Sequence, residues 1–452
     1  MHSKLIKFGT AVAIASLLGA ACGDSDDGNG DDSGSPENTE QSSQQPTSPE
    51  TTAPPMSPET TEHTSDTGAH MGEEEGASPV ETGAAGLRAG LTSLLQEHVY
   101  LAGAAISTAV QAGGDMEAPA VTSAVDTLDA NSVALSEAIG GVYGDEAGAQ
   151  FLELWRNHIG FFVEYTLGGA TGDTAMQEAA GQKLDDYRAD FGAFVDSATG
   201  GELPADAVAE NLQVHVDTLI EAVDAVLAGT PDVYSKLAAA AGHMPSTASA
   251  LAGAITTQMP DVFDGDPESA ASSLRAGLTH LLQEHVYQAG LAINQAVADG
   301  GDLEAPATAD AVDTLDANSV ALSEAIGGVY GDEAGAQFLE LWRNHIGFFV
   351  EYTLGGATGD TAMQEAAGQK LDDYRADFGA FVDSATGGEL PADAVAENLQ
   401  VHVDTLIAAV DAVLAGTPDV FPLLREAAQH MPGTALALSQ AISAQMPEQF
   451  PG

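Results

Sequence analysis

Apolar residues recur every three or four positions along most of the chain after about residue 82, and this period predicts amphipathic α-helices. The first half of this region predicts six helices, over about 82–112, 118–142, 145–169, 173–198, 204–228 and 233–255, with glycine or proline between them. Alternation with a period of two, which would predict β-strands, is absent from the sequence. The pattern therefore predicts an all-α fold built from helical bundles.

The second half of the chain repeats the first without a gap. Residue i of the first copy corresponds to residue i + 187 of the second, so 86–265 aligns with 273–452. Between 124 and 233 the copies differ only at Glu221, which is Ala408 in the second copy. Each copy is long enough to bury a core of its own. The sequence thus predicts two tandem helical-bundle repeats of about six helices each, over 83–266 and 267–452.

A polar segment precedes the repeats. Residues 22–82 are acidic, rich in Pro, Ser and Thr, and contain no Lys or Arg. So few large apolar residues cannot bury a core, and the segment is expected to be a disordered tether. Its aspartates do not have the spacing of a calcium-binding loop.

The N-terminus has the pattern of a bacterial export signal. Lys4 and Lys7 precede a short apolar run, and the segment ends in Leu-Leu-Gly-Ala-Ala before Cys22. This ending resembles a lipoprotein lipobox, so 1–21 is predicted to be a lipoprotein signal peptide and Cys22 the lipidated residue. The resemblance implies a protein anchored by its lipid to the extracytoplasmic face of the bacterial cell membrane. An ordinary secreted protein with an incidental cysteine is the alternative.

Composition narrows the classes of function. The chain of 452 residues has 12 Lys and Arg against 68 Asp and Glu, a net charge of -56, which would repel a nucleic-acid backbone. Nucleic acid is therefore excluded as a partner, and the acidic surface fits a salt-rich habitat or the attraction of cations. A single cysteine excludes a disulfide framework, a multi-cysteine zinc site and an iron–sulfur cluster.

Histidines supply the candidate chemistry. One lies on the apolar stripe of each of three predicted helices, and a fourth precedes a methionine in the sixth helix. Imidazole is a ligand for copper, iron and zinc, the methionine thioether suits copper(I), and bundle cores commonly hold metal between facing helices. The sequence thus predicts a transition-metal site in each repeat, with copper as the first candidate. The predicted ligands are His98, His158, His215, His243 and Met244 in the first copy and His285, His345, His402, His430 and Met431 in the second.

Metal-free histidines are the alternative. A core histidine often bonds a neighbouring polar group, and Tyr100, Asn131, Ser132, Tyr187 and Asp190 are candidate partners, with Asp190 the strongest. The spacings Glu-x-x-His and His-Glu-x-x-His, which mark known metal sites, do not occur. The histidines would then have a structural or pH-sensing role.

No motif for catalysis is present, neither a Gly-x-Ser-x-Gly elbow nor a phosphate-binding loop nor a dinucleotide fingerprint. An enzyme that uses a metal-bound oxygen species would be possible only with the predicted transition metal in place. Trp155 and Phe162, at helical spacing, are expected in the core.

The motifs Glu-His-Val-Tyr, LDANSVALSEAIGGVYG, LWRNHIGFF and the His-Met of the sixth helix resemble a helical module of bacterial secreted proteins and lipoproteins. Some members of that group carry a copper amine oxidase-like label. Genuine amine oxidases form a quinone cofactor from the Tyr of an Asn-Tyr-Asp/Glu motif in a β-sandwich, whereas this chain contains no Asn-Tyr dipeptide. The resemblance therefore implies no oxidase activity.

Together these features predict an envelope lipoprotein with two helical binding modules that bind a transition metal through core histidines. The alternative is a metal-free structural or interaction lipoprotein of a salt-adapted cell envelope.

Overall fold

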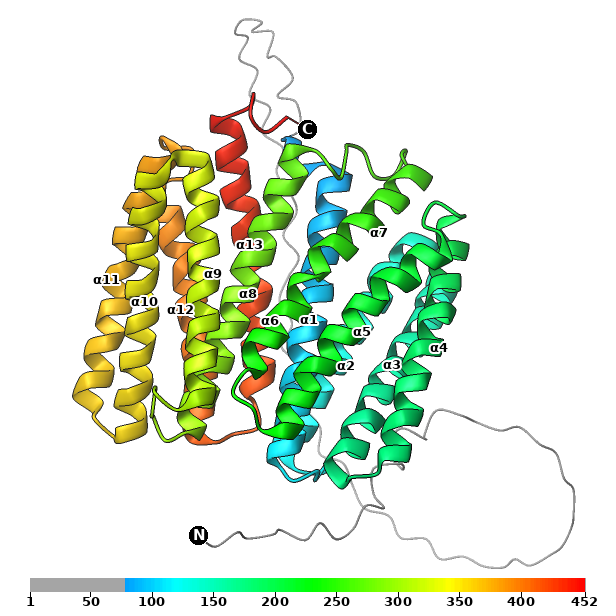
Figure 1. The fold of residues 1–452 in the computed structure, drawn as a ribbon. Helices are drawn as coiled ribbons and strands as arrows, with labels where there is room; N and C mark the ends of the chain where they lie inside the picture. Colours follow the sequence, from blue (N-terminus) through cyan, green and yellow to red (C-terminus); the bar gives the residue numbers. More distant parts are fainter. Residues whose placement is uncertain (1–77, 452) are drawn as a thin grey trace, which may run out of the picture. The chain divides into compact units, whose positions relative to one another are not determined.

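The computed structural model describes residues 78–451, which form thirteen α-helices and one short 3₁₀ helix, with no β-strand in that range (Figure 1). The predicted all-α fold class is confirmed. The predicted signal peptide, Cys22 and the predicted tether up to residue 77 lie outside the described residues. Residues 78–82, which the sequence assigns to the tether, contain the 3₁₀ helix η2 (Pro79–Glu81), whose Val80 is fully buried.

The helices follow the predicted segments closely. In the first copy they are α1 (Gly83–Gln111), α2 (Pro119–Tyr143), α3 (Asp145–Thr171), α4 (Thr174–Thr199), α5 (Ala205–Ala228), α6 (Val233–Gly242) and α7 (Met244–Gln258). In the second copy they are α8 (Ala270–Ala298), α9 (Pro306–Tyr330), α10 (Asp332–Thr358), α11 (Thr361–Thr386), α12 (Ala392–Ala415) and α13 (Val420–Gln445).

Local sequence explains where these helices begin and end. The Thr82 hydroxyl accepts from the Ala85 amide, and the Asp173 carboxylate accepts from the Met176 amide, so each caps free N–H groups at a helix start. Gly172, with φ of 72°, ends α3 in the left-handed conformation that glycine adopts without strain.

The predicted sixth helix differs between the copies. In the first it is divided into α6 and α7 at His243, whereas in the second α13 is continuous through Pro432. Both copies have a proline there, which removes one helical hydrogen bond. The first copy also has Gly242 where the second has Gln429, and glycine weakens a helix interior by about 1 kcal/mol.

The two copies are in contact along α1 and α8, which lie side by side between the other helices (Figure 1). Each of these helices packs against its own bundle on one side and against the other copy on the opposite side. Nearly every residue of α1 from Leu95 to Ile106 is therefore buried, whatever its polarity. The buried apolar side chains of both copies form one connected core. The division into two domains stays a prediction.

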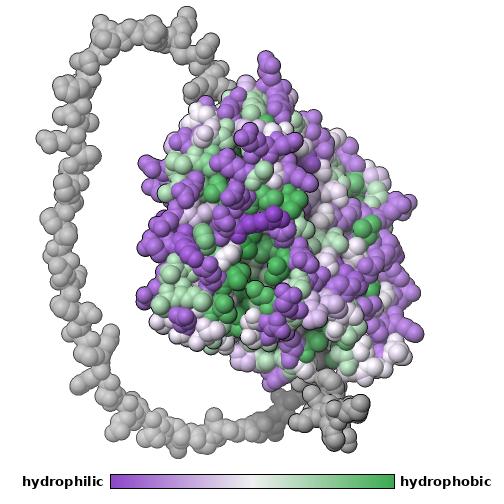
Figure 2. All heavy atoms as spheres, turned by 60° about the vertical axis from the view of Figure 1, so that its left-hand side comes forward, coloured by the Kyte–Doolittle hydropathy of each residue, from purple (hydrophilic) through white to green (hydrophobic). Residues whose placement is uncertain are grey.

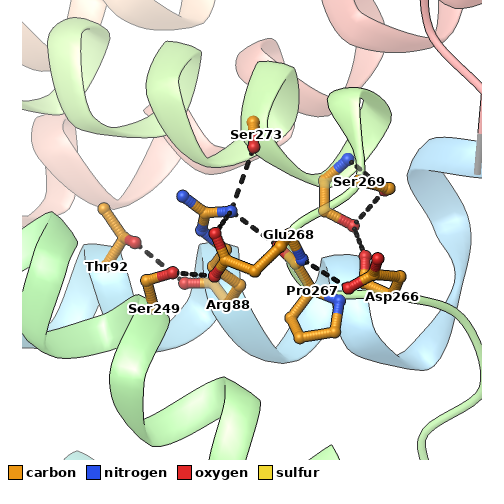
Figure 3. A network of polar contacts seen from close by, with 9 residues as sticks. Arg88, Thr92, Ser249, Asp266, Pro267, Glu268, Ser269 and Ser273 are labelled. Atoms are coloured by element: carbon orange, nitrogen blue, oxygen red, sulfur yellow. Dashed lines mark hydrogen bonds and ion pairs between the residues drawn. The ribbon is translucent and has the colours of Figure 1, made fainter.

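An arginine from each copy holds the segment that precedes the first long helix of the other. Arg88 donates to the Pro267 carbonyl at 2.6 Å and to the Ser273 hydroxyl at 3.0 Å, and it pairs with Glu268 (Figure 3). The equivalent Arg275 donates to the Val80 carbonyl at 2.9 Å. The contact between copies is thus approximately two-fold symmetric.

Charged and polar residues face outward on the bundles. Figure 2 shows one face that is mostly hydrophilic, with a smaller group of hydrophobic residues near its centre. By length and composition α12 is apolar enough to cross a membrane, and in the structure this helix packs within the second bundle.

Candidate metal centre

Three helices of the first copy bring three of the predicted histidines together. His98 comes from α1, His158 from α3 and His215 from α5, and their exposed fractions are 1%, 2% and 5%. One ring nitrogen from each lies within 4.8 Å of the other two. The ring centroids are 5.2 Å apart for His98 and His158, 6.1 Å for His98 and His215, and 6.5 Å for His158 and His215.

The second copy builds the same arrangement independently. His285 of α8, His345 of α10 and His402 of α12 have exposed fractions of 1%, 2% and 4%. Their nitrogens also lie within 4.8 Å of one another. We call these two groups the first and second histidine triads.

Two nitrogens in each triad already have the separation of ligands on a shared metal. Nε2 of His98 lies 3.3 Å from Nε2 of His158, and the His285–His345 pair has the same distance. Two nitrogens each bound at about 2.0 Å to one ion are about 3.3–3.5 Å apart at tetrahedral or trigonal angles. The same distance also allows one imidazole to donate an N–H to the other.

The remaining ring nitrogens of the triads make no hydrogen bond within the part of the chain that the structure describes. Within residues 78–451, Nδ1 of His98, Nδ1 of His158 and both nitrogens of His215 are buried without a hydrogen-bond partner. The second triad repeats this pattern at His285, His345 and His402. A buried polar group left in this state costs about 1–3 kcal/mol.

Aromatic rings surround the imidazoles. Trp155 lies 4.7 Å from His98 and 4.6 Å from His158 between ring centroids, and Tyr187 stacks on His158 at 5.0 Å. Phe162 contacts His158 from the next turn of α3 at 6.4 Å. Trp155 and Phe162 are in the core, as expected, and they form the walls of the triad.

This environment keeps the histidines neutral. Burial lowers the pKa of His158 to about 3, with a further lowering by His215, and lowers the pKa of His215 to about 4, with a contribution from His243. Burial, followed by the two neighbouring imidazoles, holds the pKa of His98 well below its usual range. Neutral imidazole is the form that binds metal.

The fourth predicted histidine lies outside each group. His243 occupies the N-cap position of α7 without a side-chain capping bond and is half-buried, and Met244 beside it is buried in the core. In the second copy His430 lies 3.2 Å from the Asn398 carbonyl, and Met431 is buried. Their part in metal binding stays a prediction.

The predicted hydrogen-bond partners of the histidines were wrong. Asp190 is exposed on α4, because Tyr187 and Phe191 occupy the inward face of that helix. Tyr100 and Asn131 bond carboxylates at the contact between the copies, and Ser132 bonds the Leu128 carbonyl of its own helix.

Sequence reasoning missed the polar network at that contact, which we call the central network. Glu97, 1% exposed, accepts from Arg425 at 2.6 Å, from Asn131 at 3.1 Å and from Tyr287 at 3.1 Å. A signal was available in LLQEHVY, which places Gln and Glu on an otherwise apolar helix and is identical in both copies although the flanks have diverged.

The arrangement offers metal coordination rather than acid–base catalysis. Each triad supplies up to three neutral nitrogen donors, and among the described residues no carboxylate belongs to either group. Burial raises the pKa of Tyr187 well above its usual value, so its hydroxyl stays protonated. No family model matches the sequence, and neither a curated protein nor a solved structure matches it.

Proposed function

We propose that this chain is an envelope lipoprotein that binds two transition-metal ions, copper or another, one at each histidine triad. The observation that carries the proposal is the convergence of three buried, neutral histidines, four of whose six ring nitrogens lack partners within the described part of the chain.

Energetics favour a ligand at these positions. Each triad has four nitrogens without a partner among the described residues, and each such group costs about 1–3 kcal/mol. Phenylalanine or leucine would fill the same space without that loss. A metal ion bound by Nε2 of His98, Nε2 of His158 and one nitrogen of His215 would use one of these four nitrogens and would replace the Nε2–Nε2 contact with coordination bonds.

The location rests on the N-terminal sequence. A lipid on Cys22 would hold the protein at the extracytoplasmic face of the membrane, and 23–77 would connect that anchor to the helical part. The excess of 68 acidic over 12 basic residues would keep such a protein hydrated in salt and attract cations to its surface.

A metal-free structural or interaction protein is the second candidate. The close packing of Trp155 and Tyr187 on the imidazoles supports it, because aromatic contacts can hold a histidine in a core without a metal. The 3.3 Å contact between Nε2 atoms is then one shared N–H.

Metal analysis separates the candidates. The full chain, purified without a histidine tag and stripped with a chelator, is dialysed in turn against copper, iron and zinc, and the bound metal is measured by mass spectrometry. We expect two ions per chain from at least one of the three metals, and none when both His158 and His345 are replaced by Ala. Wild-type protein that retains less than about 0.1 ion of each metal per chain at micromolar concentrations refutes metal binding. Circular dichroism of each variant distinguishes loss of a ligand from loss of the fold.

A further inference from the structure

We infer that the ion bound by each triad is monovalent copper, held by three imidazoles alone and enclosed in the helical core. This inference rests on the proposed metal binding and specifies the ion and its coordination.

Charge is the first argument. Three neutral imidazoles add no negative charge, so the whole charge of the ion stays in the core. The carboxylate next to His98 in sequence, Glu97, points to the other copy, where Arg425 neutralises it at 2.6 Å. Because the cost of burying a charge rises with its square, a divalent ion costs about four times as much as a monovalent one. An anion-free site therefore favours the ion of lower charge.

Coordination number is the second argument. Zinc in proteins is almost always four-coordinate, and three protein ligands leave a position for water or substrate. The rings that pack on His98 and His158 are Trp155, Phe162 and Tyr187, each at most 5% exposed, and they leave little room for a water ligand on that side. His243, which acts on His215, lies outside the group of converging nitrogens. A d¹⁰ copper(I) ion is satisfied by three nitrogens in a plane and needs no fourth ligand.

Geometry and the aromatic walls agree with this assignment. Copper(II) prefers square-planar or tetragonal ligands, which would require donors beyond the three imidazoles in each group. The centroid of the Trp155 ring lies within 4.7 Å of the centroids of two of the imidazoles, so an electron-rich indole borders the site.

The two triads are expected to bind alike. Their paired Nε2 distances are both 3.3 Å, and the aromatic walls of the second triad are Trp342, Phe349 and Tyr374, the counterparts of those in the first. The chain would then hold two copper(I) ions of similar affinity.

Competition titrations test the inference on the full-length, tag-free, metal-free protein. Copper(I) is added without oxygen against bicinchoninate, zinc(II) is added against a zinc-responsive dye, and copper(II) is added in air. We expect two copper(I) ions per chain, bound at least about 100-fold more tightly than zinc(II). The copper X-ray absorption edge should have the shape of three-coordinate copper(I) with nitrogen ligands only.

The number of ions bound by single and double variants shows which residues hold them. His158→Phe should reduce the count from two to one, and His158→Phe with His345→Phe should reduce it to zero. His280→Gln, which changes a half-buried histidine outside both triads, should leave two. His243→Gln should also leave two, and a loss there would overturn the three-nitrogen site in favour of four ligands.

The wild-type measurements keep the test independent of how the variants fold. Two zinc(II) or copper(II) ions per chain, bound as tightly as copper(I), would overturn this inference and leave the proposed metal binding intact. Failure to bind copper(I), zinc(II) and copper(II) would overturn this inference, and failure to bind iron as well would overturn the proposed metal binding.

Discussion

The histidine triads and the central network share helices α1 and α8, and both are buried. Their ionisable groups nevertheless differ in hydrogen bonding, because the carboxylates of the network are paired and most ring nitrogens of the triads are not. Glu97 and His98 are neighbours on α1, and each is 1% exposed. Each carboxylate oxygen of Glu97 accepts at least one hydrogen bond, and Arg425 compensates its charge. Nδ1 of His98, in contrast, has no partner in the range that the structure describes.

The presence or absence of hydrogen-bond partners distinguishes a polar group that stabilises the fold from one that is available to a ligand. A buried charge must be paired or the fold loses several kcal/mol, so the central network is complete around its carboxylates. A buried neutral imidazole with a partnerless nitrogen costs less than an unpaired buried charge, so the fold tolerates such nitrogens in the triads.

The central network itself differs between its two halves. Glu97 has the permanent charge of Arg425, whereas Glu284 has His280 at 3.9 Å, and burial lowers the pKa of that histidine. Ala238 occupies the position equivalent to Arg425, and Ser93 the position equivalent to His280. Each carboxylate thus obtains a different nitrogen partner from residues that diverged after the duplication.

The largest effect is expected from acid on the metal-free protein. The pKa of His158 is about 3 and that of His215 about 4 in the folded chain, both below the unfolded value near 6.5. Below about pH 6.5 the unfolded chain binds protons that the folded chain does not. The free energy of unfolding therefore decreases as the pH is lowered, and well below pH 6.5 it decreases by about 1.4 kcal/mol per pH unit for each such histidine.

Urea unfolding at pH 7, 6 and 5 checks this, because most carboxylates stay ionised over that range. His158→Phe with His345→Phe should reduce the average slope between pH 7 and 5 by about 2 kcal/mol per pH unit, since two histidines are removed. An unchanged slope would show that these histidines do not resist protonation in the fold.

Removing the cation of the central network is expected to have the next largest effect. Arg425→Met leaves the Glu97 carboxylate buried beside no permanent positive charge and should lower the free energy of unfolding by about 3–5 kcal/mol. The matched control is Arg343→Met, which removes a pair with Asp316 whose side chains are 48% and 47% exposed, and it should cost at most about 1 kcal/mol. Equal losses of unfolding free energy in Arg425→Met and Arg343→Met would contradict the distinction between the buried and the exposed ion pair.

The smallest predicted effect compares two tyrosines. Tyr287→Phe removes a hydroxyl that donates to Glu97 at 3.1 Å and should cost about 1.5–3 kcal/mol. Tyr187→Phe removes a hydroxyl that has no partner among the described residues, so it should not destabilise the metal-free protein and should stabilise it by up to about 1–3 kcal/mol. Thermal unfolding of both variants measures the difference, and a larger loss for Tyr187→Phe would mean that its hydroxyl is bonded.

The helices and the candidate residues were predictable because their signals are local. The three-and-four spacing, the glycines and the prolines defined nearly every helix within a few residues, and the division at His243 was the main exception. The apolar stripes also placed His98, His158 and His215 on the inward faces of their helices.

The sequence by itself determined an all-α chain of two copies in which each copy has histidines in its core. Only the tertiary structure decided that three histidines rather than four converge, that Asp190 faces outward, and that Glu97 reaches the other copy. Successive residues on a helix point about 100° apart, so Glu97 and His98 necessarily meet different neighbours. Which neighbours those are depends on how whole helices pack, and no local pattern contains that information.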